Sequence, residues 1–360
     1  MEEGLTGKAE LILGGSVRVP EGVRLPQPTP GEPPCPNTAV LEFDGYRVRV
    51  ATSQSEGEYS LRVEGKKKMS IVKGDRVVAP DVSLSVPNRG CDKQLVIDMS
   101  GGITPEEVAL IAERTASRRK VKMISFSARF IGDMDDAVDR IARSIEAVKW
   151  LSPNGAIGVE AWLTSVDQVS RLKKAGVNEI KIDLGCVRRD VFEKVYPDRD
   201  YDAVLDLLRK SVGVFRKGKL ACDVYYGLGE SDQDIDILLE KICRMGVIPI
   251  IRTPRPDDIG RIENAGMDVE APSVLRSVFL CGLEKSAMRR HGVDPSTFRT
   301  MCPSCGACIL VPFKDVRCRT PFLWRAPAAR TTCTCCPVSA PRISDTASDP
   351  PSGDPPQEAA

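Results

Sequence analysis

Three cysteines near the end of the chain have the spacing of metal ligands. They lie in the segment Cys302-Pro-Ser-Cys305-Gly-Ala-Cys308, a C-x2-C-x2-C pattern. Thiolates this close in sequence can face one soft metal centre, and the spacing is that of three ligands to a cubane iron–sulfur cluster. The bacterial ferredoxin run would place a fourth cysteine where this chain has Pro312. Either the fourth ligand comes from elsewhere, or one iron keeps an open position for chemistry.

Charged residues at the ends of expected strands form a second candidate site. Glu160, Asp183 and Arg252 each lie in or directly after an apolar run that is typical of a buried strand. A charge at such a place costs free energy unless it is paired or bound to a ligand, so the three residues predict a polar pocket. The alternative is internal pairing, of Glu160 with Arg252 or of Asp183 with Lys181.

A glycine-rich turn, Tyr226-Gly227-Leu228-Gly229-Glu230, follows the fifth expected strand. Its amides precede a helix, so Gly227, Gly229 and Glu230 are candidates for holding a carboxylate, a ribose or a phosphate. The competing interpretation is a tight strand-to-helix turn that binds no ligand.

The other metal-binding residue types give weaker signals. His291 is the only histidine, which argues against histidine triads and histidine-rich metal sites. It is either a fourth cluster ligand or a histidine at the surface end of a helix. Four of the thirteen cysteines stand singly beside apolar residues, and we expect them to be small buried hydrophobes. These four are Cys186, Cys222, Cys243 and Cys281.

The composition is that of an ordinary soluble globular protein. The chain has 360 residues, of which 42% are hydrophobic and 28% charged, and 51 basic against 50 acidic residues give a net charge of +1. This balance argues against a nucleic-acid or anionic-membrane surface. No apolar run reaches the roughly 18 residues of a transmembrane helix, and the first residues lack the features of a signal peptide. We expect a cytoplasmic protein with no membrane and no nucleic-acid partner.

The elements that could position these residues begin with a small antiparallel β unit. Asp44-Gly45, between the strand-type runs Val40–Phe43 and Tyr46–Val50, predicts a type I′ hairpin. Further strands are expected at Tyr59–Val63, Met69–Val72 and Val77–Val86. The preceding segment, rich in proline and glycine from 15 to 36, predicts an extended arm.

From Gln94 onward, strand and helix patterns alternate. The expected strands are Gln94–Met99, Val121–Phe126, Ala156–Ala161, Glu179–Leu184, Leu220–Tyr226 and Val247–Ile251. A helix follows each strand, and Thr104-Pro105-Glu106-Glu107 opens the first helix with a capping-box pattern. Six repeated βα units require parallel strands with right-handed crossovers. They predict an α/β protein with a partial (βα)6 TIM-like barrel, or alternatively a doubly wound sheet, with functional loops at the C-terminal strand ends.

The sequence therefore divides into five segments. They are an extended N-terminal arm over 1–37, the small β unit over 38–90, the partial barrel over 91–300, a cysteine-rich cluster motif over 301–316 and a tail over 317–360. The tail is dense in Pro, Ser, Thr, Ala and Arg without any period, which predicts disorder. Because the composition changes within a few residues, a divergent or frameshifted reading of the gene is one hypothesis for it.

Several motifs together resemble the radical SAM superfamily, and most closely its biotin-synthase-related proteins. The matching pieces are Ile157–Glu160, Leu172–Gly176, Glu179–Ile182, Tyr225–Asp232, Met245–Pro249 with Arg252, and Thr300–Val316. Leu41–Gly45 in the small β unit is similar to the family's N-terminal extension. The resemblance covers most of residues 8–316 and implies a barrel of the radical SAM type with a [4Fe–4S] cluster on Cys302, Cys305 and Cys308. The S-adenosylmethionine contacts that it implies are Glu160, Asp183, Gly227, Gly229, Glu230 and Arg252.

One part of the family pattern is missing. Members of the family carry a C-x3-C-x2-C loop after the first barrel strand, and the [4Fe–4S] cluster on this loop cleaves S-adenosylmethionine to a 5′-deoxyadenosyl radical. Here Gly101-Gly102 follows the first strand directly, and no cysteine lies between Cys91 and Cys186. The second-strand motif is altered to Ser125-Phe126-Ser127-Ala128. The resemblance then implies a surviving auxiliary cluster without standard radical generation, and it leaves S-adenosylmethionine binding open.

Three functions fit these features. The first is a degenerate radical SAM iron–sulfur protein that acts on an unknown small-molecule substrate. The second is a non-catalytic barrel that serves as a scaffold or as the binding partner of an active paralogue. The third is a zinc-stapled structural protein, in which Cys318 completes a closed site of four thiolates with the three spaced cysteines.

Overall fold

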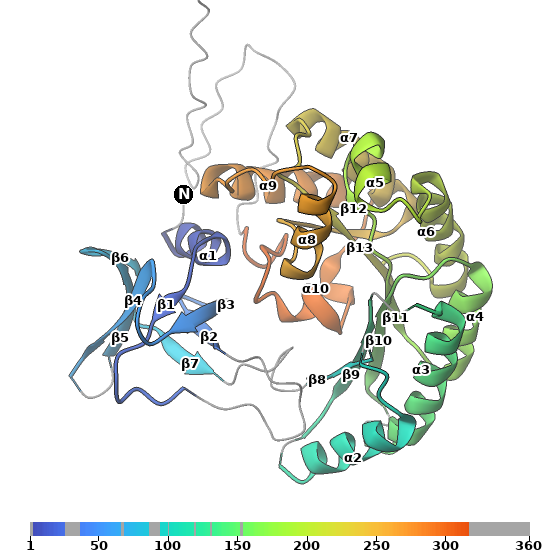
Figure 1. The fold of residues 1–360 in the computed structure, drawn as a ribbon, viewed down its shortest axis with the longest axis horizontal. Helices are drawn as coiled ribbons and strands as arrows, with labels where there is room; N and C mark the ends of the chain where they lie inside the picture. The colour runs from blue at the N-terminus through green and yellow to red at the C-terminus, as the bar shows by residue number, and fades with distance from the viewer. Residues whose placement is uncertain are drawn as a thin grey trace, which may run out of the picture.

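The part of the chain that the computed structural model describes contains two β-sheets, and most of the helices follow the outer side of the second (Figure 1). It describes residues 3–25, 37–65, 68–85, 94–99, 101–118, 120–129, 132–151 and 154–316. The predicted disordered tail over 317–360 lies outside these residues, and so does Cys318.

The first sheet belongs to the N-terminal part of the chain. Its strands are β1 (Val17–Arg18), β2 (Thr38–Phe43), β3 (Tyr46–Ser53), β4 (Tyr59–Glu64), β5 (Lys68–Lys73), β6 (Arg76–Ala79) and β7 (Ser83–Ser85). They lie in the order β6-β5-β4-β1-β3-β2-β7. All neighbours pair antiparallel except β1, which runs parallel to both β3 and β4. The predicted antiparallel unit is therefore a mixed sheet, because a strand from the preceding segment enters it.

Two turns in this sheet test the sequence patterns. Asp44 and Gly45 have φ angles of 46° and 71°, as a type I′ turn requires, which confirms the predicted hairpin. The single strand expected over Val77–Val86 is wrong. Pro80 has no amide hydrogen to continue the ladder, and the chain turns at Asp81, where φ is 47°. The two resulting strands, β6 and β7, lie at opposite edges of the sheet, so the sheet curls round on itself.

The extended arm expected over 1–37 is also wrong at its beginning, because Glu3–Leu13 forms helix α1. Leu5 and Ala9 lie one helical turn apart and are buried in the core of the first sheet. Glycine weakens a helix, but Gly7 lets α1 approach the sheet closely. A side chain at this position would place its Cβ 2.4 Å from the carbonyl oxygen of Val78.

The second sheet is parallel. Its strands are β8 (Gln94–Asp98), β9 (Met123–Ala128), β10 (Ala156–Ala161), β11 (Glu179–Lys181), β12 (Gly185–Cys186), β13 (Leu220–Tyr225) and β14 (Ile248–Arg252). The pairing runs β8-β9-β10-β11-β13-β14, and β12 pairs with β13 beyond the end of β11. Of the strand expected over Glu179–Leu184, only Glu179–Lys181 forms a strand, β11, and the short strand β12 begins after the expected range. The chain is an α/β protein with a parallel sheet, as predicted.

Helices connect these strands. The long ones are α2 (Pro105–Ala116), α3 (Met134–Val148), α4 (Val166–Ala175), α6 (Tyr201–Phe215), α7 (Asp232–Met245) and α9 (Val274–Arg290). The predicted capping box is confirmed, because the Thr104 hydroxyl accepts from the Glu107 amide and the Glu107 carboxylate accepts from the Thr104 amide. The sequence patterns missed two helices in the loops, α5 (Arg189–Val195) and α8 (Pro256–Asn264), which are too short to show a helical period.

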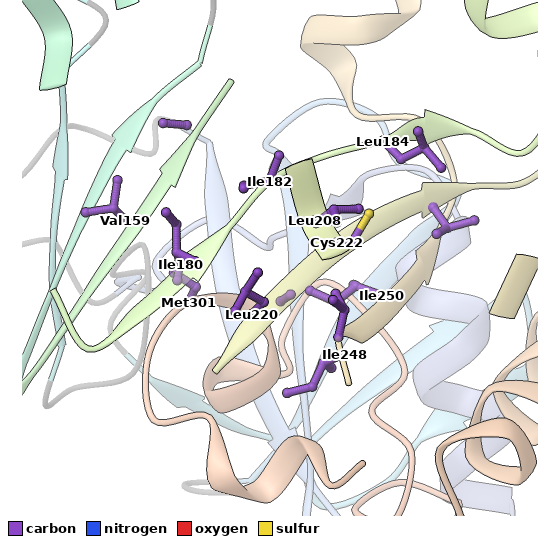
Figure 2. Packing of buried hydrophobic residues seen from close by; sticks show 14 of the residues in the cluster. Val159, Ile180, Ile182, Leu184, Leu208, Leu220, Cys222, Ile248, Ile250 and Met301 are labelled. Carbon is purple, nitrogen blue, oxygen red and sulfur yellow. The ribbon is translucent and has the colours of Figure 1, made fainter. Parts of the chain in front are cut away.

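Apolar side chains alternate along the parallel strands and fill the space under the outer helices. Val159, Ile180 and Cys222 belong to this core, with Leu208 of α6 beside them (Figure 2). The four single cysteines are all buried, as predicted, and burial raises the pKa of the Cys186 thiol to about 12. Successive strand residues point to opposite faces, so the positions between these apolar residues face the inner side of the curved sheet.

The C-terminal segment covers this inner side. It contains a 3-10 turn, η2 (Pro295–Thr297), and the short helix α10 (Met301–Cys305), which lies inside the curve of the sheet (Figure 1). Gly158 of β10 allows the close contact, since a Cβ there would lie 2.3 Å from the Thr300 hydroxyl oxygen. The cysteine-rich segment is therefore packed against the parallel sheet rather than placed outside it.

Candidate functional site

The inner face of the parallel sheet is polar. The strand register places Glu160 beside Lys181, and it places Asp223 and Arg252 on the same face of β13 and β14. On the other side of Glu160, the register continues to Ser127 of β9 and Asp98 of β8. Side chains from six strands thus meet in the space between the sheet and the C-terminal segment.

A cavity of about 640 Å³ occupies this space. Cys302, Cys305 and Cys308 all line it, together with the predicted site residues Glu160 and Arg252. Cys305 is buried, and Cys302 and Cys308 are partly buried. The structure therefore brings the three thiols and two of the strand-end charges to one cavity, although nearly 150 residues separate Glu160 from Cys308 in the sequence.

Glu179 holds the beginning of the cysteine segment. This fully buried carboxylate accepts hydrogen bonds from the amides of Arg299 and Thr300, and from the Thr300 hydroxyl at 2.8 Å. The ammonium group of Lys219 contacts the same carboxylate at 2.9 Å. Glu179 lies in β11, so the start of α10 is fixed directly to the sheet.

Lys8 and Asp315 hold the other end. The Lys8 ammonium donates to the carbonyl oxygen of Gly306 at 2.7 Å and to Asp315 Oδ2 at 2.6 Å, and both side chains are buried. Asp315 also accepts from the Val311 amide. The Arg49 amide of β3 donates to the carbonyl oxygen of Ala307 at 2.8 Å. The loop that carries Cys305 and Cys308 is thus held by the N-terminal helix and the first sheet.

An ion-pair network lies beneath the cavity. The Arg255 guanidinium bridges Glu160 Oε1 and Asp223 Oδ2, each at 2.5 Å. Lys181 contacts Asp223 at 2.9 Å and Glu160 at 3.3 Å. Arg129 contacts Asp183 at 3.1 Å, and it contacts Asp258 of α8 at 2.8 Å. The internal Asp183–Lys181 pair is present at 3.5 Å, whereas Glu160 pairs with Arg255 rather than with Arg252.

These contacts lower the pKa of two of the carboxyl groups, whereas the pKa of a third is raised. Burial raises the pKa of Glu160, but Arg255 and Lys181 outweigh it and bring the value down to about 2. The same two cations lower the pKa of Asp223 against the effect of burial. For Asp183, burial raises the pKa and the neighbouring Asp223 and Glu160 raise it further, while Lys181 opposes them. Glu160 and Asp223 are therefore charged at neutral pH.

Three of these carboxylates have oxygen atoms within 4.8 Å of one another, a spacing that suits a metal ion. They are Glu160, Asp183 and Asp223. However, Lys181 contacts all three of them within 3.5 Å. Their charge is thus balanced by protein cations, and we do not assign a metal site to them.

The predicted glycine turn forms hydrogen bonds within itself. The Glu230 carboxylate accepts from the amides of Gly227 and Leu228 at 2.8 and 2.9 Å, and Arg276 contacts it at 3.1 Å. Gly227 and Gly229 have φ angles of 93° and 82°, so both positions favour glycine for the turn itself. None of these three predicted residues is among the described residues that line the cavity. A ligand role for Gly227, Gly229 and Glu230 stays a prediction.

The structure also describes the connection after β8 and the position of the single histidine. The connection from β8 to α2 spans only residues 99–104, and Gly102, with φ at 74°, donates its amide to Met99. His291 follows the last residue of α9, and its Nε2 lies 2.7 Å from the Glu240 carboxylate. It is not among the described residues that line the cavity with the thiols.

A second, larger cavity of about 740 Å³ lies behind the cysteine segment, beside Phe298, Pro303 and Lys314. Among the described residues that line it, none is a cysteine or one of the network carboxylates. We therefore place the candidate site at the smaller cavity, where the reactive side chains converge.

Sequence reasoning missed several site residues. The sequence patterns indicate Lys181 only as a partner of Asp183, and they do not indicate Asp223, Arg129 or Arg255. The signal was present for the strand residues, because Glu179-Ile180-Lys181-Ile182-Asp183 alternates polar and apolar side chains, as a strand with one polar face should. Arg129 and Arg255 lie just beyond their strands, where no periodic pattern identifies them.

No protein-family model matches the sequence, and no curated protein matches it. Solved structures match in part. Elp3 from Methanocaldococcus infernus has a TM-score of 0.39 and 11% identity over 54% of each chain. Coproporphyrinogen III oxidase (HemN) from Escherichia coli, a radical SAM enzyme, has a TM-score of 0.40 and 10% identity over 80% of this chain and 55% of its own. DHPS from Yersinia pestis has a TM-score of 0.29 and 12% identity over 54% of this chain and 82% of its own.

The matches to Elp3 and HemN span only about half the length of those two structures. Likenesses of this size do not assign the chain to a family. None of the described helices is both long and apolar enough to cross a membrane.

Proposed function

We propose that this chain is an iron–sulfur protein of the radical SAM type, related to biotin synthase, that has lost the primary cluster for cleaving S-adenosylmethionine. Its [4Fe–4S] cluster is held by Cys302, Cys305 and Cys308 inside a partial (βα)6 barrel formed by the parallel sheet. The observation that carries the proposal is the convergence of the three thiols on one cavity with Glu160 and Arg252. The sequence motifs support the family, independently of the structural matches.

The surroundings of the thiols fit such a cluster. Cysteine must lose its proton to bind iron, and burial raises the pKa of both Cys302 and Cys305. Cations oppose this effect, Lys181 and Arg255 at Cys302, and Arg47 and Arg49 at Cys305. These positive side chains favour the thiolate form, and they favour the net negative charge that three thiolates bring to a cluster.

The number of thiols favours a cluster over a structural zinc ion. Structural zinc is almost always held by four ligands, whereas the run from Cys302 to Cys308 supplies three thiolates. In a cubane each of three thiolates can bind a different iron, which leaves one iron open. When bound, the cluster would supply one-electron transfer and, with three protein ligands, one open coordination position.

We expect anaerobically prepared protein to contain about four irons and four sulfides per chain, the composition of one cubane cluster. Cys305→Ser should lose most of this iron, because two thiolates remain to hold it. Cys243→Ser is the matched control, since Cys243 is buried in α7 and does not line the cavity. Iron, sulfide and zinc analysis provides the measurement. A colourless protein loaded with zinc would contradict the proposal.

One observation favours a second candidate, a non-catalytic barrel that binds a ligand or an active paralogue. The connection after β8 spans only residues 99–104, which leaves no cysteine loop at the position where the family places its primary cluster. We expect reduced, iron-loaded protein to form no 5′-deoxyadenosine from S-adenosylmethionine. If the nucleoside forms and is lost in Cys305→Ser, radical generation survives and this second candidate is wrong.

A further inference from the structure

Arg252 has an unmet requirement for an anion in the cavity. It ends β14 and lines the cavity together with Cys302. Its side chain is only 15% exposed, and the nearest carboxylate oxygen that contacts it, Asp223 Oδ2, lies 3.8 Å from Nη1. That distance is too long for a hydrogen bond. The Nε atom is buried and has no hydrogen-bond partner.

Asp223 does not satisfy Arg252, because other cations hold its Oδ2 and its buried Oδ1 has no hydrogen-bond partner. Lys181 contacts Asp223 Oδ2 at 2.9 Å, and Arg255 contacts the same atom at 2.5 Å. Arg255 itself differs from Arg252, since it also contacts Glu160 at 2.5 Å. The network thus pairs Arg255 with two carboxylates. It leaves the Arg252 guanidinium at the cavity without a carboxylate at hydrogen-bond distance.

A mostly buried guanidinium whose nearest carboxylate oxygen lies 3.8 Å away lacks a hydrogen-bonded anion, which is costly, and its planar fork of donors matches a carboxylate. It carries one positive charge, so a monocarboxylate suits it better than a phosphate dianion. The cavity also has apolar walls from Val96, Phe126 and Met301. We propose that the cavity binds a small carboxylic acid with an apolar body, whose carboxylate Arg252 grips beside Cys302.

This inference rests on the proposed function only in using the same cavity. S-adenosylmethionine also carries a carboxylate, but it brings a sulfonium and an ammonium as well. Those positive charges would face a cavity lined by four arginines and only two carboxylates, Asp98 and Glu160. S-adenosylmethionine and a simple carboxylic acid share the carboxylate. We favour the simple acid as the ligand because its body is uncharged.

The test is calorimetric titration of the full chain with sodium benzoate and with benzamide, a neutral molecule of nearly the same shape. We expect benzoate to bind and benzamide to bind at least tenfold more weakly. Arg252→Gln should weaken benzoate binding about 10- to 100-fold, the usual effect of losing a charge-assisted hydrogen-bond pair. Arg252→Lys should lose part of the affinity, because it keeps the charge but not the fork. Arg209→Gln, an exposed arginine on α6, is the control and should change nothing.

Further titrations determine which class of ligand the cavity binds. Titrations with S-adenosylmethionine and inorganic phosphate are run on protein as purified and on protein loaded with iron, with iron measured in each sample. The proposal is overturned if benzoate does not bind, if benzamide binds equally, if Arg252→Lys and Arg252→Gln bind benzoate as the parent does, or if S-adenosylmethionine or phosphate binds more tightly. Benzoate binding in a protein that takes up no iron would retain this inference and reject the cluster.

Discussion

Replacing Lys8 with methionine is expected to lower the free energy of unfolding by about 3–5 kcal/mol, the usual cost of removing one partner of a buried ion pair. The Lys8 side chain is fully buried, and its ammonium lies 2.6 Å from Asp315 Oδ2. Methionine fills a similar volume but leaves the Asp315 carboxylate buried without its cation. Urea unfolding of the full chain measures the change.

The same substitution should lower the iron content of the protein. Lys8 also donates to the carbonyl oxygen of Gly306, which lies between the ligands Cys305 and Cys308. Without this bond, the loop loses the contact that ties it to α1. Lys210→Met is the control, because Lys210 pairs with Asp206 on an exposed helix face and such pairs contribute at most about 1 kcal/mol.

A double variant separates the two roles of Lys8. Burial lowers the pKa of Lys8 although Asp315 raises it, which shows that the pair has a high desolvation cost. Lys8→Met combined with Asp315→Asn removes both charges, and the asparagine oxygen can still accept from the Val311 amide. We expect stability to recover in large part, because neutral replacements of a buried pair are often tolerated. If iron content also recovers fully, Lys8 acts only through stability and does not position the loop.

The fold shows why some parts of the structure could be predicted from the sequence. The Asp44-Gly45 turn and the Thr104–Glu107 capping box are local, because each depends on the φ preferences or side-chain hydrogen bonds of adjacent residues. The parallel strands were predicted because their apolar runs are long and regularly spaced. Local chemistry fixes such elements wherever they are placed in the fold.

Helix α1 depends on distant contacts instead. Gly4 and Gly7 weaken the local helix signal, but tertiary packing against the first sheet compensates for it. The partners of α1 are up to 307 residues away, as the Lys8–Asp315 contact shows. No local pattern contains that information.

The candidate site was predictable to a similar extent. The cysteine spacing, Glu160 and Arg252 were each visible as unusual residue types at strand ends or at ligand spacing. Their meeting at one cavity follows from the C-terminal segment folding back under the sheet, which requires Gly158 to let Thr300 approach. The pairing of Glu160 with Arg255 depends on the loop after β14, whose conformation no periodicity encodes.

The second large effect is expected at Asp223. Asp223→Asn should lower the free energy of unfolding by about 3–5 kcal/mol at neutral pH, because Lys181 and Arg255 lose the anion that both contact. Lys181 is fully buried, so no water can replace the lost charge. Asp206→Asn, on an exposed face of α6, should change stability by no more than about 1 kcal/mol. Wild-type stability in Asp223→Asn would contradict the importance of the network.

The pH dependence gives a second measure of the same substitution. Asp223 and Glu160 have folded-state pKa values below their unfolded values of 3.8 and 4.5. A carboxyl group of this kind contributes stability that is fully present above its unfolded pKa and is lost as the pH falls toward its folded pKa, which is about 2 for Glu160. Asp183, whose pKa is raised, has the opposite slope above pH 3.8. Asp223→Asn removes one depressed group, so its stability should fall less steeply between pH 5 and pH 2 than that of the parent protein.

Asp223→Asn should also make Cys302 more reactive, which links the network to the proposed cluster. Burial raises the pKa of Cys302, the Asp223 charge raises it further, and Lys181 and Arg255 lower it. Removing the Asp223 charge leaves the two cations to favour the thiolate, the form that reacts with alkylating agents. We expect faster alkylation of Cys302 by iodoacetamide at pH 7 in iron-free Asp223→Asn than in the parent protein, measured by mass spectrometry under conditions where both remain folded. An unchanged rate would show that the ion-pair network does not control the thiol it lies beneath, and the network would then serve stability alone.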